Sequence, residues 1–249
     1  ILEGTEYIYY DENTIGNAID DWYIDAIRTM IPGHFIPVPK DSCKIRASKV
    51  SIQVPPQRAH EVIEAAKSKP YGFQAFYPGP GLGGHCIPLD PYYLSWKARE
   101  YGFHTSMIES SMMINDKMPE YTVERTSDIL NRFEKSLKGA KVLQLGVAYK
   151  QDIDDYRESP ALVVGDLLRK EGCLVDYYDP YVREYKYKGQ KYQSMEKISP
   201  DIVKKYDIVI VTAGHTTIDY DMVAENAVAV FDTKNAMKNV KNRTKIELL

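Results

Sequence analysis

The 249-residue sequence has no long apolar run, few cysteines and little excess charge. Its apolar stretches, such as residues 207–213, are far shorter than the roughly 20 residues of a membrane-spanning helix. Residues 1–11 lack the basic and apolar regions of a signal peptide. A formal net charge of -3 provides no footprint for nucleic acid or an anionic membrane surface. We therefore predict a soluble protein that binds neither nucleic acid nor membrane.

The three cysteines, Cys43, Cys86 and Cys173, are odd in number and widely spaced, with no CxxC pair. No cluster of metal ligands lies near them, so the pattern predicts neither a disulfide framework nor a metal site. Such cysteine usage favours a reducing, cytoplasmic setting. The sequence starts at Ile1 instead of Met, which is what a fragment of a longer chain would show.

Three segments differ in composition. Residues 1–58 contain the run IPGHFIPVP, whose prolines break any long helix, and we expect an irregular amino-terminal segment. Residues 59–137 combine helix-forming runs with a loop rich in glycine and proline, which predicts a partial central helical region. Residues 138–249 alternate apolar strands with helices and show no internal repeat. Because buried parallel strands read as continuous apolar runs, this segment predicts an α/β domain with a doubly wound parallel sheet.

The predicted elements follow from these patterns. Helices are expected over residues 60–69, 92–102 (stopped at Gly102), 118–137 (with Pro119 in the first turn), 159–172 and 219–224, and strands over 141–149, 174–180, 207–213 and 227–234.

The glycines of the loop satisfy the letter of the dinucleotide motif GxGxxG through Gly79, Gly81 and Gly84. The true motif follows an apolar strand and opens a helix at its last glycine. Here no apolar strand leads in, and we expect residues 86–88 to interrupt the start of a helix. We therefore do not interpret these glycines as a cofactor-phosphate loop. Lacking side chains, Gly83 and Gly84 would let the backbone approach a sugar and expose the following thiol.

A single cysteine is by default a small buried hydrophobe. Cys86 differs because it stands in the glycine- and proline-rich loop, beside His85 and just ahead of Asp90. A place at the start of a helix would favour its thiolate. Cys43 and Cys173 have no such surroundings, and we predict structural roles for both. Cys86 is the candidate nucleophile.

The run FYPGPGLGGHCIPLDP, followed by GVAYKQDIDDYRESPA, resembles the UDP-glucose/GDP-mannose dehydrogenase family. Its GGHCIP form is similar to the branch that oxidises UDP-N-acetylglucosamine or UDP-N-acetylmannosamine. The resemblance extends from about His60 to the end of the chain. It implies a Rossmann-like UDP-sugar domain at residues 138–249 and NAD-dependent four-electron oxidation of the C6 hydroxyl of a UDP-N-acetylhexosamine to the uronic acid, in a homo-oligomer. The choice between gluco and manno substrates stays open.

The resemblance implies roles for the first motif by position. Cys86 matches the nucleophile that captures the C6 aldehyde as a thiohemiacetal and then becomes a thioester, which divides one difficult step into two easier ones. Asp90 matches the carboxylate that helps to activate the hydrolytic water. The loop that binds the sugar and diphosphate in the family corresponds to a set of four residues: Phe76, Tyr77, Gly79 and Gly83.

In the second motif, Lys150 is expected at the end of a strand, at the carboxyl edge where ligands bind in α/β sheets. It matches a substrate-contacting lysine of the family. Arg157 matches an arginine that contacts NAD, and a planar guanidinium suits a diphosphate. Ser159 before Pro160 predicts a helix N-cap. We interpret Glu158 as structural.

Other polar residues allow two interpretations. His85 has the chemistry of a base, although we favour loop packing or substrate shaping. Thr212 and His215 resemble the family's strand-end turn, and we interpret both as architecture. Lys234 and Asn235 follow the last predicted strand, where they either line the nucleotide cleft or end an exposed strand.

The family's amino-terminal NAD domain, with its own GxGxxG and a KxxxN helix, is not recognisable, and residues 1–58 match no part of the family. We therefore expect a truncated or incomplete form whose NAD site is largely missing. The alternative is a catalytically silent UDP-sugar-binding or dimerisation module. A cysteine hydrolase using Cys86 and His85 is disfavoured, because neighbouring residues cannot be assumed to face each other and no orienting group is evident.

Overall fold

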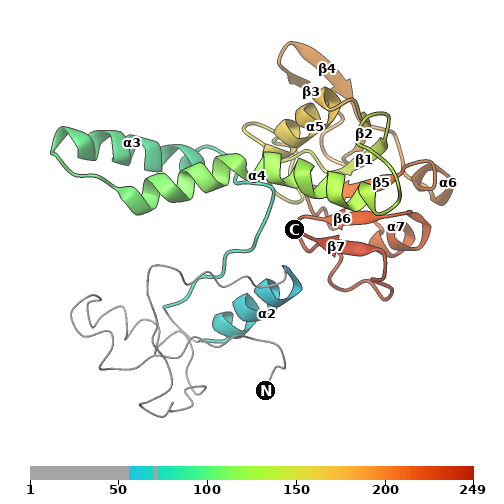
Figure 1. Ribbon diagram of the computed structural model, residues 1–249, viewed down its shortest axis with the longest axis horizontal. Helices are drawn as coiled ribbons and strands as arrows, with labels where there is room; N and C mark the ends of the chain where they lie inside the picture. Colours follow the sequence, from blue (N-terminus) through green and yellow to red (C-terminus); the bar gives the residue numbers. More distant parts are fainter. Residues whose placement is uncertain (1–55, 70–71) are drawn as a thin grey trace. The chain divides into compact units, whose positions relative to one another are not determined.

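The computed structural model describes residues 56–69 and 72–249, and the chain divides into two compact units, residues 1–76 and 77–249 (Figure 1). The predictions for residues 1–55 lie outside the described residues. Within the first unit, helix α2 (Pro56–Lys67) confirms the helix expected over residues 60–69.

The second unit is built around a parallel sheet of five strands in the order β2-β1-β5-β6-β7 (Figure 1). Helices cover both faces, so the predicted doubly wound α/β domain is confirmed. The strands are β1 (Lys141–Leu145), β2 (Leu174–Tyr178), β5 (Ile208–Val211), β6 (Val230–Asp232) and β7 (Ile246–Leu248).

Alternate residues of the strands contribute to two apolar cores. Val142 and Ile210 pack with α4 (Ser106–Asn131) and α5 (Pro160–Lys170) on one face of the sheet. Leu143 and Val211 pack with α6 (Pro200–Val203) and α7 (Tyr220–Asn226) on the other. Because successive strand side chains point to opposite faces, a short apolar run supplies both cores at once.

The long helix α4 corrects the expected helix over residues 118–137. It begins at Ser106, so Pro119 lies inside the helix and is buried instead of occupying the first turn. Proline has no N–H, so the carbonyl of Asn115 loses its helical partner. Helix α4 packs against both α5 and α3 (Cys86–Glu100), and α3 is followed by Gly102 at φ 71°, as predicted. None of the described helices is long and apolar enough to cross a membrane.

A β-hairpin occupies the stretch after β2, where the sequence pattern predicted no helix or strand. Strands β3 (Glu184–Tyr187) and β4 (Gln190–Gln193) pair antiparallel. Lys188 and Gly189 form the turn, both with positive φ (47° and 80°), which suits the twist of a two-residue hairpin.

Strand β1 is shorter than predicted. It ends at Leu145 instead of continuing to Tyr149, because Gly146 turns away at φ 81°. A Cβ at Gly146 would lie 2.5 Å from the Cβ of Ala213, so the chain passes close against the end of β5. Residues 147–158 consequently form a loop over the carboxyl edge of the sheet, hereafter the edge loop. Lys150 lies in this loop and not at the end of a strand.

Candidate active site

The two sequence motifs contact each other through glycines. A Cβ at Gly83 would lie 2.6 Å from the Cβ of Tyr149 and 2.9 Å from the carbonyl oxygen of Glu158. A Cβ at Gly84 would lie 3.2 Å from the Tyr149 ring. These glycines therefore seat the cysteine loop (residues 77–85) on the edge loop. We predicted that they leave room for a sugar, but protein atoms occupy those positions.

The cysteine loop leads directly into α3, which begins at Cys86. The expectation that residues 86–88 interrupt a helix is wrong, because Pro88 lies in the first turn, where a missing N–H costs nothing. No strand occurs in residues 72–85, so the glycine run still lacks the setting of a dinucleotide loop. The N–H of Leu82 donates to Oδ1 of Asn115 at 2.8 Å, which ties the cysteine loop to α4.

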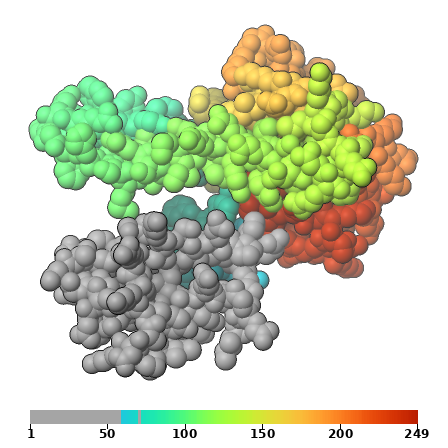
Figure 2. Space-filling model, viewed as in Figure 1, coloured from blue at the N-terminus to red at the C-terminus, as the bar shows by residue number. Residues whose placement is uncertain are grey.

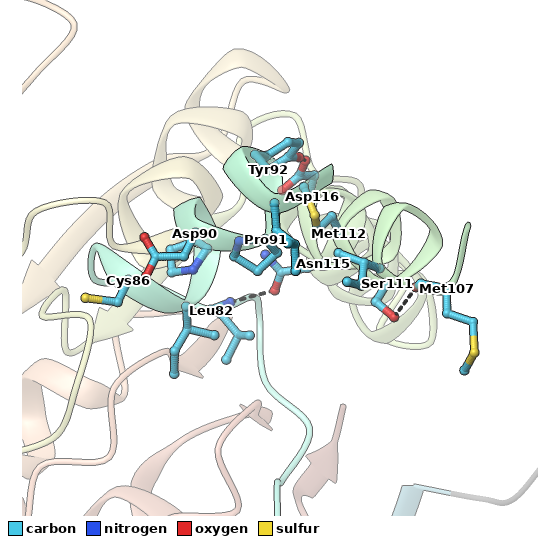
Figure 3. A pocket seen from close by; sticks show the side chains of 14 residues that line it. Leu82, Cys86, Asp90, Pro91, Tyr92, Met107, Ser111, Met112, Asn115 and Asp116 are labelled. Carbon is cyan, nitrogen blue, oxygen red and sulfur yellow. Dashed lines mark hydrogen bonds between the residues drawn. The ribbon is translucent and has the colours of Figure 1, made fainter. Parts of the chain in front are cut away.

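Cys86 and Asp90 stand one helical turn apart on α3, and both are exposed. They lie at one end of an open groove of about 740 Å³ between α3 and α4 (Figure 3). In this view the Cys86 sulfur points away from the α4 side chains. The groove is lined mainly by apolar side chains, including Leu94, Met107 and Met112, which offer little to a sugar diphosphate. The polar groups suited to a nucleotide lie instead at the carboxyl edge of the sheet.

Lys150 is exposed in the edge loop, beside Tyr149, on which the cysteine loop is seated. Within residues 56–69 and 72–249, its ammonium has no hydrogen bond or ion pair. An unpaired cation at the carboxyl edge of a doubly wound sheet is well placed to receive an anionic ligand.

Lys234 follows β6 at the same edge, and its ammonium also has no ionic partner in the described part of the chain. Its Nζ would lie 2.9 Å from a Cβ placed on Gly79, so it reaches the cysteine loop. The buried carboxylate of Asp232 fixes the turn by accepting hydrogen bonds from the N–H groups of Lys234, Ala236 and Met237. Asn235 in this turn has a φ of 50°. Lys234 therefore lies where the sheet edge meets the cysteine loop.

Behind the edge loop, Asp179 and His215 are both fully buried, and Asp179 Oδ2 lies 3.0 Å from His215 Nε2. Burial alone would raise the pKa of Asp179, but hydrogen bonds from His215, Val147 and Val182 lower it below its usual range. Thr212 is buried as well and donates its hydroxyl to the carbonyl of Gly146. These contacts agree with an architectural interpretation of Thr212 and His215.

Arg157 ends the edge loop with its guanidinium exposed and paired with Asp155, at 2.7 Å between Nη2 and Oδ2. This ion pair lowers the pKa of Asp155. Ser159 accepts a hydrogen bond from the N–H of Ala161 at 3.3 Å, which confirms the predicted N-cap of α5. Of the remaining loop candidates, Tyr77 is exposed in the second unit, whereas Phe76 belongs to the first and is exposed there.

The two described cysteines differ sharply. Cys173 is buried, donates its thiol to the carbonyl of Leu137, and has its pKa raised to about 11 by burial. This confirms its structural role, while Cys43 lies outside the described residues. No hydrogen bond joins Cys86 to His85 in the described part of the chain, so the hydrolase alternative gains no support.

Sequence reasoning missed Asp179 and Asp232, the two buried carboxylates that fix the edge. Asp179 directly follows an apolar strand in the run YYDP, and Asp232 closes an apolar strand in the run VFDT. A carboxylate in that position was the available signal, because strand ends leave backbone N–H groups that need acceptors.

Fold and site together define an α/β protein in which an exposed thiol at a helix start adjoins a cationic sheet edge. The chain belongs to the UDP-glucose/GDP-mannose dehydrogenase family: residues 57–117 match its central domain and residues 143–239 its UDP-binding domain.

Similar proteins include the UDP-N-acetyl-D-mannosamine dehydrogenase of Methanocaldococcus jannaschii, 34% identical over 74% of this chain and 37% of that one. The UDP-N-acetyl-D-glucosamine 6-dehydrogenase of Salmonella typhi is 34% identical over 62% of this chain and 35% of its own length. The solved UDP-D-ManNAc dehydrogenase of Pyrococcus horikoshii is 26% identical, with a TM-score of 0.63, over 76% of this chain and 43% of that one. The chain thus spans less than half the length of these relatives.

Proposed function

We propose that residues 77–249 bind the diphosphate of a UDP-N-acetylhexosamine at the carboxyl edge of the sheet and present Cys86 to its C6 carbon. The observation that carries this proposal is the seating of the cysteine loop on the edge loop through Gly83. This contact brings the start of α3 to the sheet edge that bears Lys150 and Lys234. The names of the relatives support the N-acetylhexosamine class without separating gluco from manno.

The two lysines suit the diphosphate. Both ammonium groups lack an ionic partner within residues 56–69 and 72–249, so neither must break an ion pair to accept a phosphate. Charge-assisted hydrogen bonds of this kind are about twice as strong as neutral ones. Gly79, whose open side faces Lys234 Nζ, leaves space for that ammonium above the cysteine loop. Tyr77 is proposed as a further contact of the sugar nucleotide, whereas Phe76, the other aromatic candidate of the motif, belongs to the first unit.

Cys86 and Asp90 would divide the chemistry. The aldehyde arises when C6 of the alcohol gives up a hydride to the oxidant and its hydroxyl gives up a proton. The Cys86 sulfur then adds to the aldehyde carbon, and the thiol proton is balanced by the proton that the carbonyl oxygen takes up. The thiohemiacetal formed can lose a second hydride and its hydroxyl proton, where a free aldehyde cannot easily lose hydride. The thioester that remains is cleaved by water. Asp90, one turn along the same exposed face, accepts the proton of that water, and the uronic acid leaves as Cys86 regains its thiol.

NAD is the hydride acceptor that the family resemblance implies. A dinucleotide pyrophosphate takes a strand–glycine–helix turn, and residues 72–85 contain no strand, while α5 begins well beyond the end of β1. The described residues therefore do not fit a dinucleotide site, and we propose Arg157 alone as an NAD contact. Because that arginine is exposed, it can exchange Asp155 for a phosphate.

The test is paired. Calorimetry with UDP and both UDP-N-acetylhexosamines should detect binding, and absorbance at the NADH band should detect little or no turnover by residues 1–249 alone. Cys86→Ser should bind UDP as the parent does. A chain that binds no UDP contradicts the proposal, and turnover that survives in Cys86→Ser contradicts the role of the thiol.

The alternative, a silent UDP-sugar-binding or dimerisation module, has one observation in its favour. Three large apolar side chains are exposed on α3 and the first half of α4, which project from the sheet body in Figure 2: Trp96 (64% exposed), Met107 (85%) and Ile114 (60%). Exposed large apolar residues on neighbouring helices are typical of protein interfaces, and we propose a homo-oligomer that covers them. Light scattering should then show a dimer or larger species that Met107→Glu weakens. A cytoplasmic location is proposed with either function.

A further inference from the structure

The edge loop is anchored on both sides of Lys150. Before it, the N–H groups of Val147 and Ala148 donate to Asp179 Oδ2 at 2.7 and 3.2 Å. After it, the N–H of Asp152 donates to His215 Nδ1 at 2.9 Å. The position of the Lys150 main chain therefore depends on the Asp179 carboxylate and the His215 imidazole, which follow strands β2 and β5.

His215 links the two anchors. Because Nδ1 accepts the Asp152 N–H, the ring proton is on Nε2, and the neutral imidazole donates to Asp179 at 3.0 Å. Asp179 cannot easily shift to compensate for a change at His215, since its Oδ1 accepts the N–H groups of Tyr181 and Val182, both at 2.9 Å. Both side chains are fully buried, so water is not available as a replacement partner.

Asp152 needs this support because its backbone is left-handed, at φ 60°. Such a conformation costs free energy in a residue other than glycine and persists only where neighbours hold it. The Asp152 carboxylate accepts hydrogen bonds from the N–H and hydroxyl of Thr216, at 2.8 and 2.9 Å, while its N–H depends on His215. Removing the imidazole acceptor would let Asp152 relax and carry Lys150 away from the sheet edge.

We propose that His215 is a positioning residue for the sugar nucleotide: it sets the geometry of Lys150 from behind, without touching the ligand. This inference rests on the proposed function, in which Lys150 contacts the diphosphate. It assigns UDP affinity to a buried side chain that lies on the far side of the loop from the ligand.

The test is a double-mutant cycle of UDP binding by the full chain, measured by calorimetry. His215→Ala should weaken UDP binding about tenfold, the loss that one hydrogen bond of ordinary strength supports. Lys150→Met should weaken binding by at least as much. The double variant should bind no more weakly than Lys150→Met, because the effect of His215 passes through Lys150.

Two matched variants keep the test valid if His215→Ala does not fold. His215→Asn places a carbonyl oxygen near the position of the imidazole Nδ1, so it can still accept the Asp152 N–H and should keep UDP affinity within about threefold of the parent chain. His215→Gln keeps only the hydrogen bond to Asp179 and should lose UDP affinity. If the parent chain binds UDP and Lys150→Met weakens binding, equal affinities of the Asn and Gln variants would refute the inference alone. Additive losses in the cycle would refute it too. A parent chain that binds no UDP would refute the proposed function, and the inference with it.

Discussion

Replacing Gly83 by alanine tests the contact that joins the two motifs. The added Cβ would lie 2.6 Å from the Cβ of Tyr149, 2.9 Å from the Glu158 carbonyl oxygen and 3.0 Å from Cδ of Pro160. To reach an ordinary contact of 3.4 Å, the cysteine loop and the edge loop must separate by about 0.8 Å. The obstructing atoms belong to or adjoin the main chain, so no side-chain rotation can relieve the clash.

We expect Gly83→Ala to destabilise the fold by about 1–3 kcal/mol, the usual cost of overpacking. For a unit of this size that corresponds to a fall in Tm of about 2–12 °C, measured by circular dichroism. The matched control is Gly79→Ala, whose Cβ would meet only the flexible side chain of Lys234, with its terminal Nζ nearest at 2.9 Å. It should change stability by less than about 0.5 kcal/mol yet weaken UDP binding by displacing the ammonium. Equal Tm values for Gly83→Ala and the parent chain would refute the proposed seating.

Three further variants or measurements probe the support of the site. The pKa of Asp179 is lowered in the fold, so its negative charge stabilises the folded state at neutral pH, and this stabilisation is lost as pH falls through the folded pKa. Asp179→Asn should therefore lower the free energy of unfolding in urea by about 1–3 kcal/mol near neutrality and by progressively less in acid. A loss that does not depend on pH would contradict this prediction. Ser159→Ala should cost about 0.5–2 kcal/mol by removing the N-cap of α5, whereas Ser159→Asp should not; equal losses in the two variants would argue against capping. Iodoacetamide followed by peptide mapping should label exposed Cys86 well before buried Cys173, whose pKa is about 11, and the reverse order would contradict the site geometry.

Strands β1, β2, β5 and β6 and the N-cap of α5 could be predicted because they depend on local patterns, whereas β7 was not predicted. The short, β-branched apolar run around Ile208–Val211 is typical of a buried strand, and Ser159 followed by proline is typical of a helix start. The hairpin was missed because Lys188-Gly189 is a weaker turn signal than Asn-Gly. Pro119 misled because a proline is expected in the first turn of a helix, whereas here it is buried inside α4, a long helix that packs against α3 and α5.

The chemistry of the site was predictable only in part. The family motif points to Cys86, Asp90 and Lys150, but it does not reveal which atoms hold them. Asp179 and His215 lie 36 residues apart in sequence, and their contact depends on strand order, which the sequence pattern leaves open. The same limit applies to Gly83, whose partner Tyr149 is distant in the chain.

The most direct test of the central claim, that a UDP-sugar binds at the sheet edge beside the cysteine, is the alkylation rate of Cys86 with and without UDP-N-acetylhexosamine. Quantitative mass spectrometry of the Cys86 peptide supplies the rate, and buried Cys173 serves as the internal control for unfolding. Saturating ligand should slow Cys86 labelling at least about tenfold, because the sugar covers the start of α3. Lys150→Met should lose this protection at the same ligand concentration. An unchanged Cys86 rate in the presence of a ligand that calorimetry shows to be bound would contradict the account.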